Sequence, residues 1–190
     1  MTERNPSVPQ VAEVVAEFRH ALAGSAPDRS GVVGLLLRLH ENNALQWDRE
    51  DASRGDDADD RAVAEAKRDI DALNRKRHDL VEAIDAALAA VIDQSPSAPP
   101  TTESPGMVFD RLSVLVIRIA FTDRAARTER VDRDEFAARL PALHEQLASL
   151  EAALEALFDD MQAGRKRFVP YRSFKLYERS GSHGADSRRG

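Results

Sequence analysis

The chain has 190 residues, of which 42% are hydrophobic and 32% charged, with no cysteine and a formal net charge of −6. This length supports one domain with a hydrophobic core, and the composition is that of a globular protein. The lack of cysteine excludes a disulfide framework, a thiolate nucleophile and a cysteine-ligated zinc site, and it fits the reducing cytoplasm. The negative charge argues against broad nucleic-acid binding.

The sequence predicts neither a secretory signal nor a membrane span. The N-terminus lacks an apolar core of the signal-peptide kind. The most apolar run, residues 112–121, is ten residues long and contains Arg118. It is therefore too short to cross a bilayer, and we expect a cytoplasmic protein without a membrane partner.

Hydrophobic residues at helical spacing predict five helices. The first covers residues 8–22, the second residues 31–52 or 31–54, and the third and longest residues 57–93. A stiff Pro-rich linker over residues 94–103 follows. Ser104 and Pro105 then form the N-cap and first position of a fourth helix that reaches residue 127. The fifth covers residues 132–163, where Pro141 should kink the helix or split off its first turns.

No stretch alternates as a β-strand would, so we expect an all-α fold. Residues 1–179 should form a single domain, an antiparallel helical bundle of four to five long helices. The aromatic and basic C-terminal segment over residues 168–177 should be ordered, whereas residues 180–190 are typical of a flexible tail. From Gly164 onward there are eight Lys or Arg and two Asp or Glu. This basic segment should fold back on the acidic bundle.

Polar side chains on the second helix continue the direction of its apolar stripe. On a helical wheel, where successive residues are 100° apart, these side chains fall within a sector roughly 100° wide. A buried charge costs several kcal/mol unless it is paired, so an inward-facing cluster needs partners or a ligand. The alternative is that the helix end emerges into water and this face is solvated. The sector contains His40, Asn43, Trp47, Glu50, Asp51 and Arg54.

The third helix has a polar stripe beside its apolar one. This stripe is either an exposed ladder of i,i+4 ion pairs or a second wall of a binding site. Asn74 favours a site, because asparagine is a poor residue for an exposed helix interior. The stripe consists of Lys67, Asp71, Asn74, His78, Glu82 and Asp85.

The fourth helix is apolar nearly all round, as a central helix should be. Arg111 and Arg118 interrupt it, are seven residues apart and share a face. At the centre of a bundle each guanidinium must meet a carboxylate or an anionic ligand. Internal ion pairs are the structural alternative, and the candidate carboxylates are Glu50, Asp51 and Asp71.

Metal and cofactor motifs are weak. Glu17-x-x-His20 has the spacing of a di-iron ligand pair, but a second such pair is missing. The sequence also lacks a glycine-rich phosphate loop, a nucleophile elbow and a His-Glu-x-x-His motif. We therefore predict no metal site, and the sequence indicates no particular cofactor.

Four segments resemble the bacterial domain-of-unknown-function family 4254. They are residues 40–54, residues 67–85, the Pro-Gly and Asp-Arg-Leu-Ser motifs of residues 104–115, and residues 171–177 with Lys175-x-Tyr177. Two features depart from the family pattern: His78 replaces a common Asn, and the Asn-Asp-Pro that follows Lys-x-Tyr is absent. The resemblance implies an all-helical fold and a loose association with bacterial glycan and specialised-metabolite pathways, without an established reaction.

These patterns favour a small-molecule enzyme or binding protein with a cleft between the second, third and fourth helices. Its ligand would be a small anionic molecule, a sugar-derived phosphate or carboxylate. The acid/base candidates are His40, Glu50, Asp51 and Asp71, because burial and neighbouring charges would shift their pKa values. The substrate-binding candidates are Asn43, Trp47, Arg54, Lys67, Asn74, Arg111, Arg118, Lys175 and Tyr177.

Two other functions fit the same sequence. A non-catalytic helical interaction partner of a biosynthetic enzyme would show a contiguous apolar patch and no deep polar cleft. A chorismate-mutase-like or metal-dependent helical enzyme has only the charged segment of residues 67–71 in its favour. The apolar fourth helix could be covered within one chain or by a second copy, which leaves a homodimer open.

Overall fold

The computed structural model describes residues 7–24, 30–52, 60–128 and 131–173. These residues form five α-helices: α1 (Val11–Leu22), α2 (Gly31–Ala52), α3 (Asp60–Val91), α4 (Pro105–Arg127) and α5 (Arg133–Gln162). In this part of the chain there is no β-strand, only an isolated bridge between Pro100 and Arg167. The predicted all-α fold is confirmed, and each helix end lies within three residues of its predicted position.

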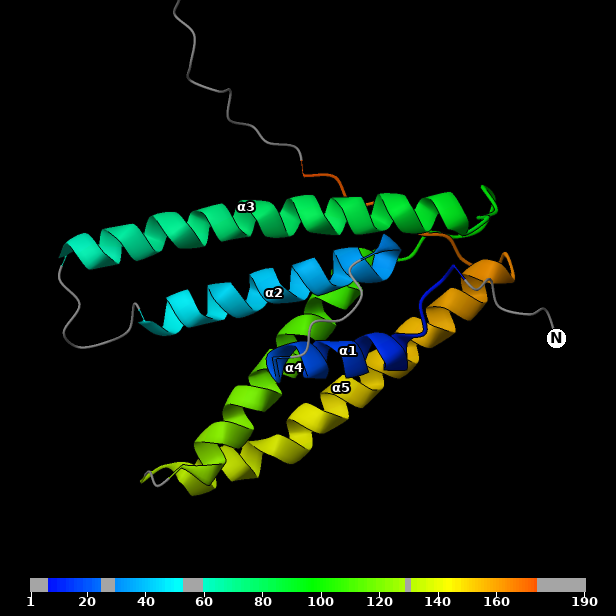
Figure 1. Cartoon of the computed structure of the whole chain (residues 1–190). Helices are drawn as coiled ribbons and strands as arrows, with labels where there is room; N and C mark the ends of the chain where they lie inside the picture. The colour runs from blue at the N-terminus through cyan, green and yellow to red at the C-terminus, as the bar shows by residue number, and fades with distance from the viewer. Residues whose placement is uncertain (1–6, 25–29, 53–59, 129–130, 174–190) are drawn as a thin grey trace, which may run out of the picture.

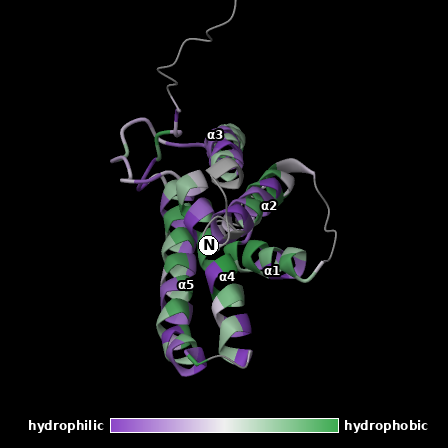
Figure 2. Ribbon diagram, turned by 90° about the vertical axis from the view of Figure 1, so that its left-hand side faces the viewer, coloured by the Kyte–Doolittle hydropathy of each residue, from purple (hydrophilic) through white to green (hydrophobic). Residues whose placement is uncertain are grey.

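Two helical hairpins make up the body of the molecule. α2 packs against α3, α4 packs against α5, and the two hairpins cross where α4 meets α2 (Figure 1). α1 lies over this crossing and contacts α2, α4 and α5. Figure 2 shows hydrophobic residues of α1 and α4 gathered where these helices meet. Within the described ranges, none of the helices combines the length and apolarity needed to cross a bilayer.

α4 is the central helix, as its all-round apolar sequence predicts. It contacts each of the other four described helices, and Phe109, Leu112 and Ile117 are among its fully buried side chains. Ser104 caps it by accepting a hydrogen bond from the Met107 backbone N–H, and Pro105 is its first residue. The predicted N-terminus is therefore confirmed, because both signals are local to the chain.

α5 runs without a break from Arg133 to Gln162, so Pro141 does not split it. The proline lies on the exposed side of the helix. Water can there hydrogen-bond the carbonyl group that the proline leaves without an N–H partner, which lowers the cost of the interruption.

Asp85 joins three segments of the chain from a fully buried position. Its Oδ1 accepts a hydrogen bond of 2.7 Å from the Gly106 N–H, and its Oδ2 one of 2.8 Å from the Tyr171 N–H. Burial raises the pKa of Asp85, and hydrogen bonds from Ser104 and the two backbone groups oppose this rise. The carboxyl group thus fastens the start of α4 and the C-terminal segment to α3.

The C-terminal segment folds back on the bundle, as its charge predicted. Phe168 is buried and its N–H donates to Gln94 Oε1. Arg172 pairs with Glu82 of α3 at 2.8 Å. The Tyr171 hydroxyl lies 3.0 Å from Nδ1 of His78. The rest of the predicted aromatic segment and the tail of residues 180–190 lie outside the described residues.

Replacing Gly106 with alanine should destabilise the fold. A Cβ at this position would lie 2.7 Å from Asp85 Oδ1 and 2.9 Å from the Val81 carbonyl oxygen. The second contact is with backbone, which cannot rotate away. We expect Gly106→Ala to lower the free energy of unfolding by about 2 kcal/mol, although alanine favours helix over glycine by up to about 1 kcal/mol. Urea denaturation measures this change.

The same substitution in an Asp85→Ala background is the matched control. With the carboxylate removed, the extra cost of Gly106→Ala should be smaller than in the wild-type chain. A Gly106→Ala protein as stable as the wild type would contradict the close packing of α4 on α3 at this point.

Candidate functional site

A buried polar network joins α2 to α4 where they cross. His40 Nδ1 lies 2.9 Å from Ser113 Oγ. Asn43 Nδ2 donates to Ser113 Oγ at 3.1 Å and to Asp110 Oδ1 at 2.9 Å. His40, Asn43 and Ser113 are all buried. The predicted inward direction of His40 and Asn43 is therefore confirmed, and their partners are on α4.

Asp110 extends this network to α3. Its two carboxylate oxygens accept hydrogen bonds of 2.8 and 2.9 Å from Arg77 Nε, and Arg77 Nη2 also donates to Oδ2. The Asp110 side chain is 13% exposed and that of Arg77 is 30% exposed. A carboxylate so shielded from water needs such partners. The result is a guanidinium held in one orientation beside α4.

The His40 ring lies in the core, packed against α1. Its ring stacks on Phe18 of α1 at 4.4 Å between centroids, with 8° between the ring planes. Burial lowers the pKa of His40 to about 4. A hydrogen bond with the Phe18 backbone opposes part of this shift. A ring that is neutral at pH 7 and 1% exposed cannot touch a substrate, so we assign His40 a structural role.

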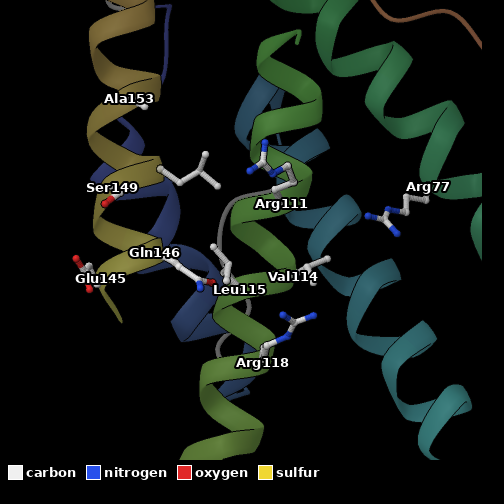
Figure 3. A pocket seen from close by; sticks show the side chains of 10 residues that line it. Arg77, Arg111, Val114, Leu115, Arg118, Glu145, Gln146, Ser149 and Ala153 are labelled. Carbon is white, nitrogen blue, oxygen red and sulfur yellow. The ribbon is translucent and has the colours of Figure 1, made fainter. Parts of the chain in front are cut away.

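An open groove of about 620 Å³ runs along α4, between α5 and the Arg77 side chain of α3. Three arginines line it: Arg77, Arg111 and Arg118. In Figure 3, Arg77 and Arg118 extend into the space between α3 and α4, and Arg111 projects from α4 one to two turns before Arg118. The groove therefore gathers positive charge from two helices.

The three arginines differ in how far they are neutralised. Arg77 is paired with Asp110, and Arg111 is paired with Glu103. Arg118 is exposed and has no hydrogen-bond or ion-pair partner among the described residues. Glu145 also lines the groove, but it extends from α5 on the side away from α4 (Figure 3). Within the described part of the chain, Arg118 thus supplies a positive charge without an ion-pair partner.

A smaller hollow of about 280 Å³ adjoins the groove and shares Arg77 and Arg111 with it. Asp110, His78 and Tyr171 also line this hollow. The C-terminal segment therefore reaches the edge of the arginine-lined groove through the contact between Tyr171 and His78.

The other predicted site residues of α2 and α3 divide into two groups. Trp47, Glu50 and Asn74 are half-buried. The Trp47 ring lies 5.5 Å from that of Phe121, and Glu50 accepts a 2.9 Å hydrogen bond from Gln46. The prediction of an inward direction is wrong for Asp51, Lys67 and Asp71, which are exposed. The end of α2 and the start of α3 run away from the α4–α5 hairpin (Figure 1).

The two predicted arginines of α4 lie at the surface and not at the bundle centre, so that part of the prediction is wrong. Arg111 and Arg118 are exposed and line the groove. None of the other predicted site residues that the structure describes lines it, and it opens between α3, α4 and α5 rather than between α2, α3 and α4. Arg54, Lys175 and Tyr177 lie outside the described residues.

Sequence reasoning missed the residues that fix the groove, Arg77, Asp110 and Ser113. Asp110 and Ser113 interrupt an apolar helix, and this was the available signal for a buried polar contact. Arg77 carried no such signal, because it lies among several charged residues of α3. Among the described residues no group of three or more His, Asp or Glu side chains could hold a metal ion.

The buried, neutral His40 makes the stability of the fold depend on pH. Its pKa is about 4 in the folded chain and 6.5 as the ordinary value, so the unfolded chain binds more protons between these limits. The free energy of unfolding should therefore fall as pH drops from 6.5 to 4, by roughly 3 kcal/mol from this group. Denaturation of the wild type and of His40→Gln at several pH values measures it.

The raised pKa of Asp85 makes the free energy of unfolding change with pH in the opposite direction in the acid range. This contribution is the same in the wild type and in His40→Gln. The difference between them should therefore isolate His40. Parallel stability curves for the two proteins would show that His40 is not desolvated in the way described.

Comparison with known proteins gives a family and no reaction. A family model described as protein of unknown function (DUF4254) matches residues 34–169. No curated protein and no solved structure matches the chain. The matched range begins in α2 and ends in the C-terminal segment, and it includes the polar network and the three arginines of the groove. The chain belongs to the DUF4254 family of proteins of unknown function.

Proposed function

We propose that this protein binds a small anionic molecule, bearing a phosphate or carboxylate group, in the groove lined by Arg77, Arg111 and Arg118. The observation that carries the proposal is the guanidinium of Arg118, which has no partner among the described residues and lies in a groove with two further arginines. The planar guanidinium matches phosphate and carboxylate geometry.

The surroundings of Arg118 favour an anion. Val114 and Leu115 lie beside it on α4 and line the same groove. These apolar side chains offer no acceptors of their own, so the guanidinium donors stay available to an anion. Gln146 and Ser149 of α5 offer polar groups nearby, which suits a ligand with hydroxyl groups next to its anionic group, as in the expected sugar-derived molecule.

Arg77 is preorganised by the interior of the protein. Asp110 holds its guanidinium, Asn43 holds Asp110, and Ser113 holds Asn43. A ligand that meets a side chain already fixed in place loses less conformational entropy on binding. The buried network thus supports a surface site on neighbouring helices.

The groups close to the groove favour binding over acid–base catalysis. Asp110 already accepts hydrogen bonds from Arg77 and Asn43, and the His78 ring is engaged by Tyr171. His40, the predicted acid/base candidate nearest to this network, is sealed in the core. We therefore propose binding as the basic activity, within the small-molecule pathway role expected from the sequence.

The alternative of a helical interaction partner has less support. The large hydrophobic side chains exposed in the described ranges are Leu45, Val131 and Val169, at 52%, 108% and 59% exposure. Leu45 is on α2, Val131 precedes α5 and Val169 is in the C-terminal segment, so no two of them lie on the same helix.

Replacing Arg118 with glutamine should weaken anion binding without weakening the fold. Inorganic phosphate serves as the probe, measured by isothermal titration calorimetry at low ionic strength. A charge-assisted hydrogen bond contributes roughly 1.5–3 kcal/mol, so Arg118→Gln should bind phosphate at least about tenfold more weakly. Its melting temperature should stay close to that of the wild type, because the side chain is exposed and unpaired among the described residues.

Arg139→Gln is the charge-matched control. Arg139 is an exposed arginine of α5 that pairs with Glu135 and lies outside the groove lining. Equal loss of phosphate binding in both variants would indicate a general charge effect. No phosphate binding by the wild-type protein would overturn the proposal.

A further inference from the structure

A second groove, of about 370 Å³, continues the first along the α4–α5 hairpin. The two grooves share Leu150 and Ala153 of α5 as lining residues. Val108 of α4 and Leu157 of α5 line the far end. Because they share these two residues, the two hollows adjoin, and together we call them the trough, with Arg118 at one end and Val108 at the other.

The trough changes character along its length. Leu115, Leu150 and Leu157 are half-buried and pack against the core with one side. Their other side lines the grooves. Ala153 is exposed, and its methyl group is too small to fill the space between them. The middle and far end of the trough thus present apolar surface to a ligand.

The charged side chains at the far end have ion-pair partners. Lys166 lines the second groove and pairs at 3.3 Å with Asp160, which also pairs with Arg165. Glu103 lines it as well and pairs with Arg111. Among the described lining residues, Arg118 and Glu145 are the charged side chains without a partner. Glu145 extends from α5 away from α4 (Figure 3), which leaves Arg118 as the unpaired charge on the α4 side of the trough. A complementary ligand carries one anionic group and an uncharged, apolar remainder.

The length of the trough limits the size of that remainder. Arg118 and Val108 are ten positions apart on α4 (118 − 108), which is roughly 15 Å at the rise of an α-helix. An aliphatic chain of medium length spans this distance from a head group at Arg118.

We propose that the ligand class is an amphiphilic anion, with a phosphate or carboxylate head at the arginines and an aliphatic tail along α4 and α5. This inference rests on the proposed anion binding and adds the tail. The tail would cover Leu115, Leu150 and Leu157, so part of the binding free energy comes from apolar burial.

A homologous series of monoalkyl phosphates tests the tail. Methyl, butyl, hexyl and octyl phosphate, each below its critical micelle concentration, are titrated into the full-length protein by calorimetry. Full burial of a methylene group tightens binding roughly fourfold. An open groove covers about half of each group, so we expect close to a twofold gain per methylene and a negative heat-capacity change that grows with chain length.

Ala153→Trp should obstruct the tail. Because Ala153 lines both grooves, the readout is the ratio of octyl to methyl phosphate affinity, which we expect to fall well below the wild-type ratio in this variant. Ala152→Trp is the matched control, because Ala152 is exposed on α5 and lies outside both groove linings. Ala153→Gln is a second variant that places a polar group at the same point with a smaller change of volume.

The outcomes separate the tail from the anion site. If methyl phosphate binds in an Arg118-dependent way but affinity does not rise with chain length, the tail is refuted and the anion site stands. If octyl phosphate gains affinity equally in Ala153→Trp and the wild type, the tail lies elsewhere and the inference is wrong. If no alkyl phosphate binds, the proposed function itself fails.

Discussion

The carboxylate of Asp110 is the contact on which the arrangement of three helices depends. It lies on the central helix α4, it is largely shielded from water, and it is bonded to Asn43 of α2 and Arg77 of α3. Removing Arg77 would leave a poorly solvated charge without its counterion, at a cost of several kcal/mol. This requirement fixes the rotation of α4 about its axis. Arg111 and Arg118 are then carried to the side of α4 that faces the groove.

The helices could be predicted because their signals are local. Hydrophobic spacing, the Ser104 cap and the glycine after α1 are all contained within a few residues. The central place of α4 also followed from its own composition. Contacts such as that of Asp85 with Gly106 and Tyr171 could not be predicted, because they join residues 21 and 86 positions apart.

The candidate site was only partly predictable, and the failures have one physical cause. A helical wheel gives the direction of a side chain around its own axis. It does not say how far the neighbouring helices extend beside it. Asn43 lies in the correct sector and at the crossing, so it is buried. Asp51 and Asp71 belong to the predicted polar stripes but are exposed, so the wheel did not give their burial.

The site combines a fixed polar interior with an exposed charge. His40 and Asp85 are buried titratable groups that serve the fold, whereas the arginines of the groove are available to a ligand. The most direct test is an NMR titration of the arginine side-chain Nε–Hε resonances with inorganic phosphate. We expect the resonances of Arg118, Arg111 and Arg77 to shift with one common dissociation constant while that of Arg139 stays unchanged. Equal shifts for all exposed arginines, or shifts confined to arginines outside the groove, would contradict an anion site on α4.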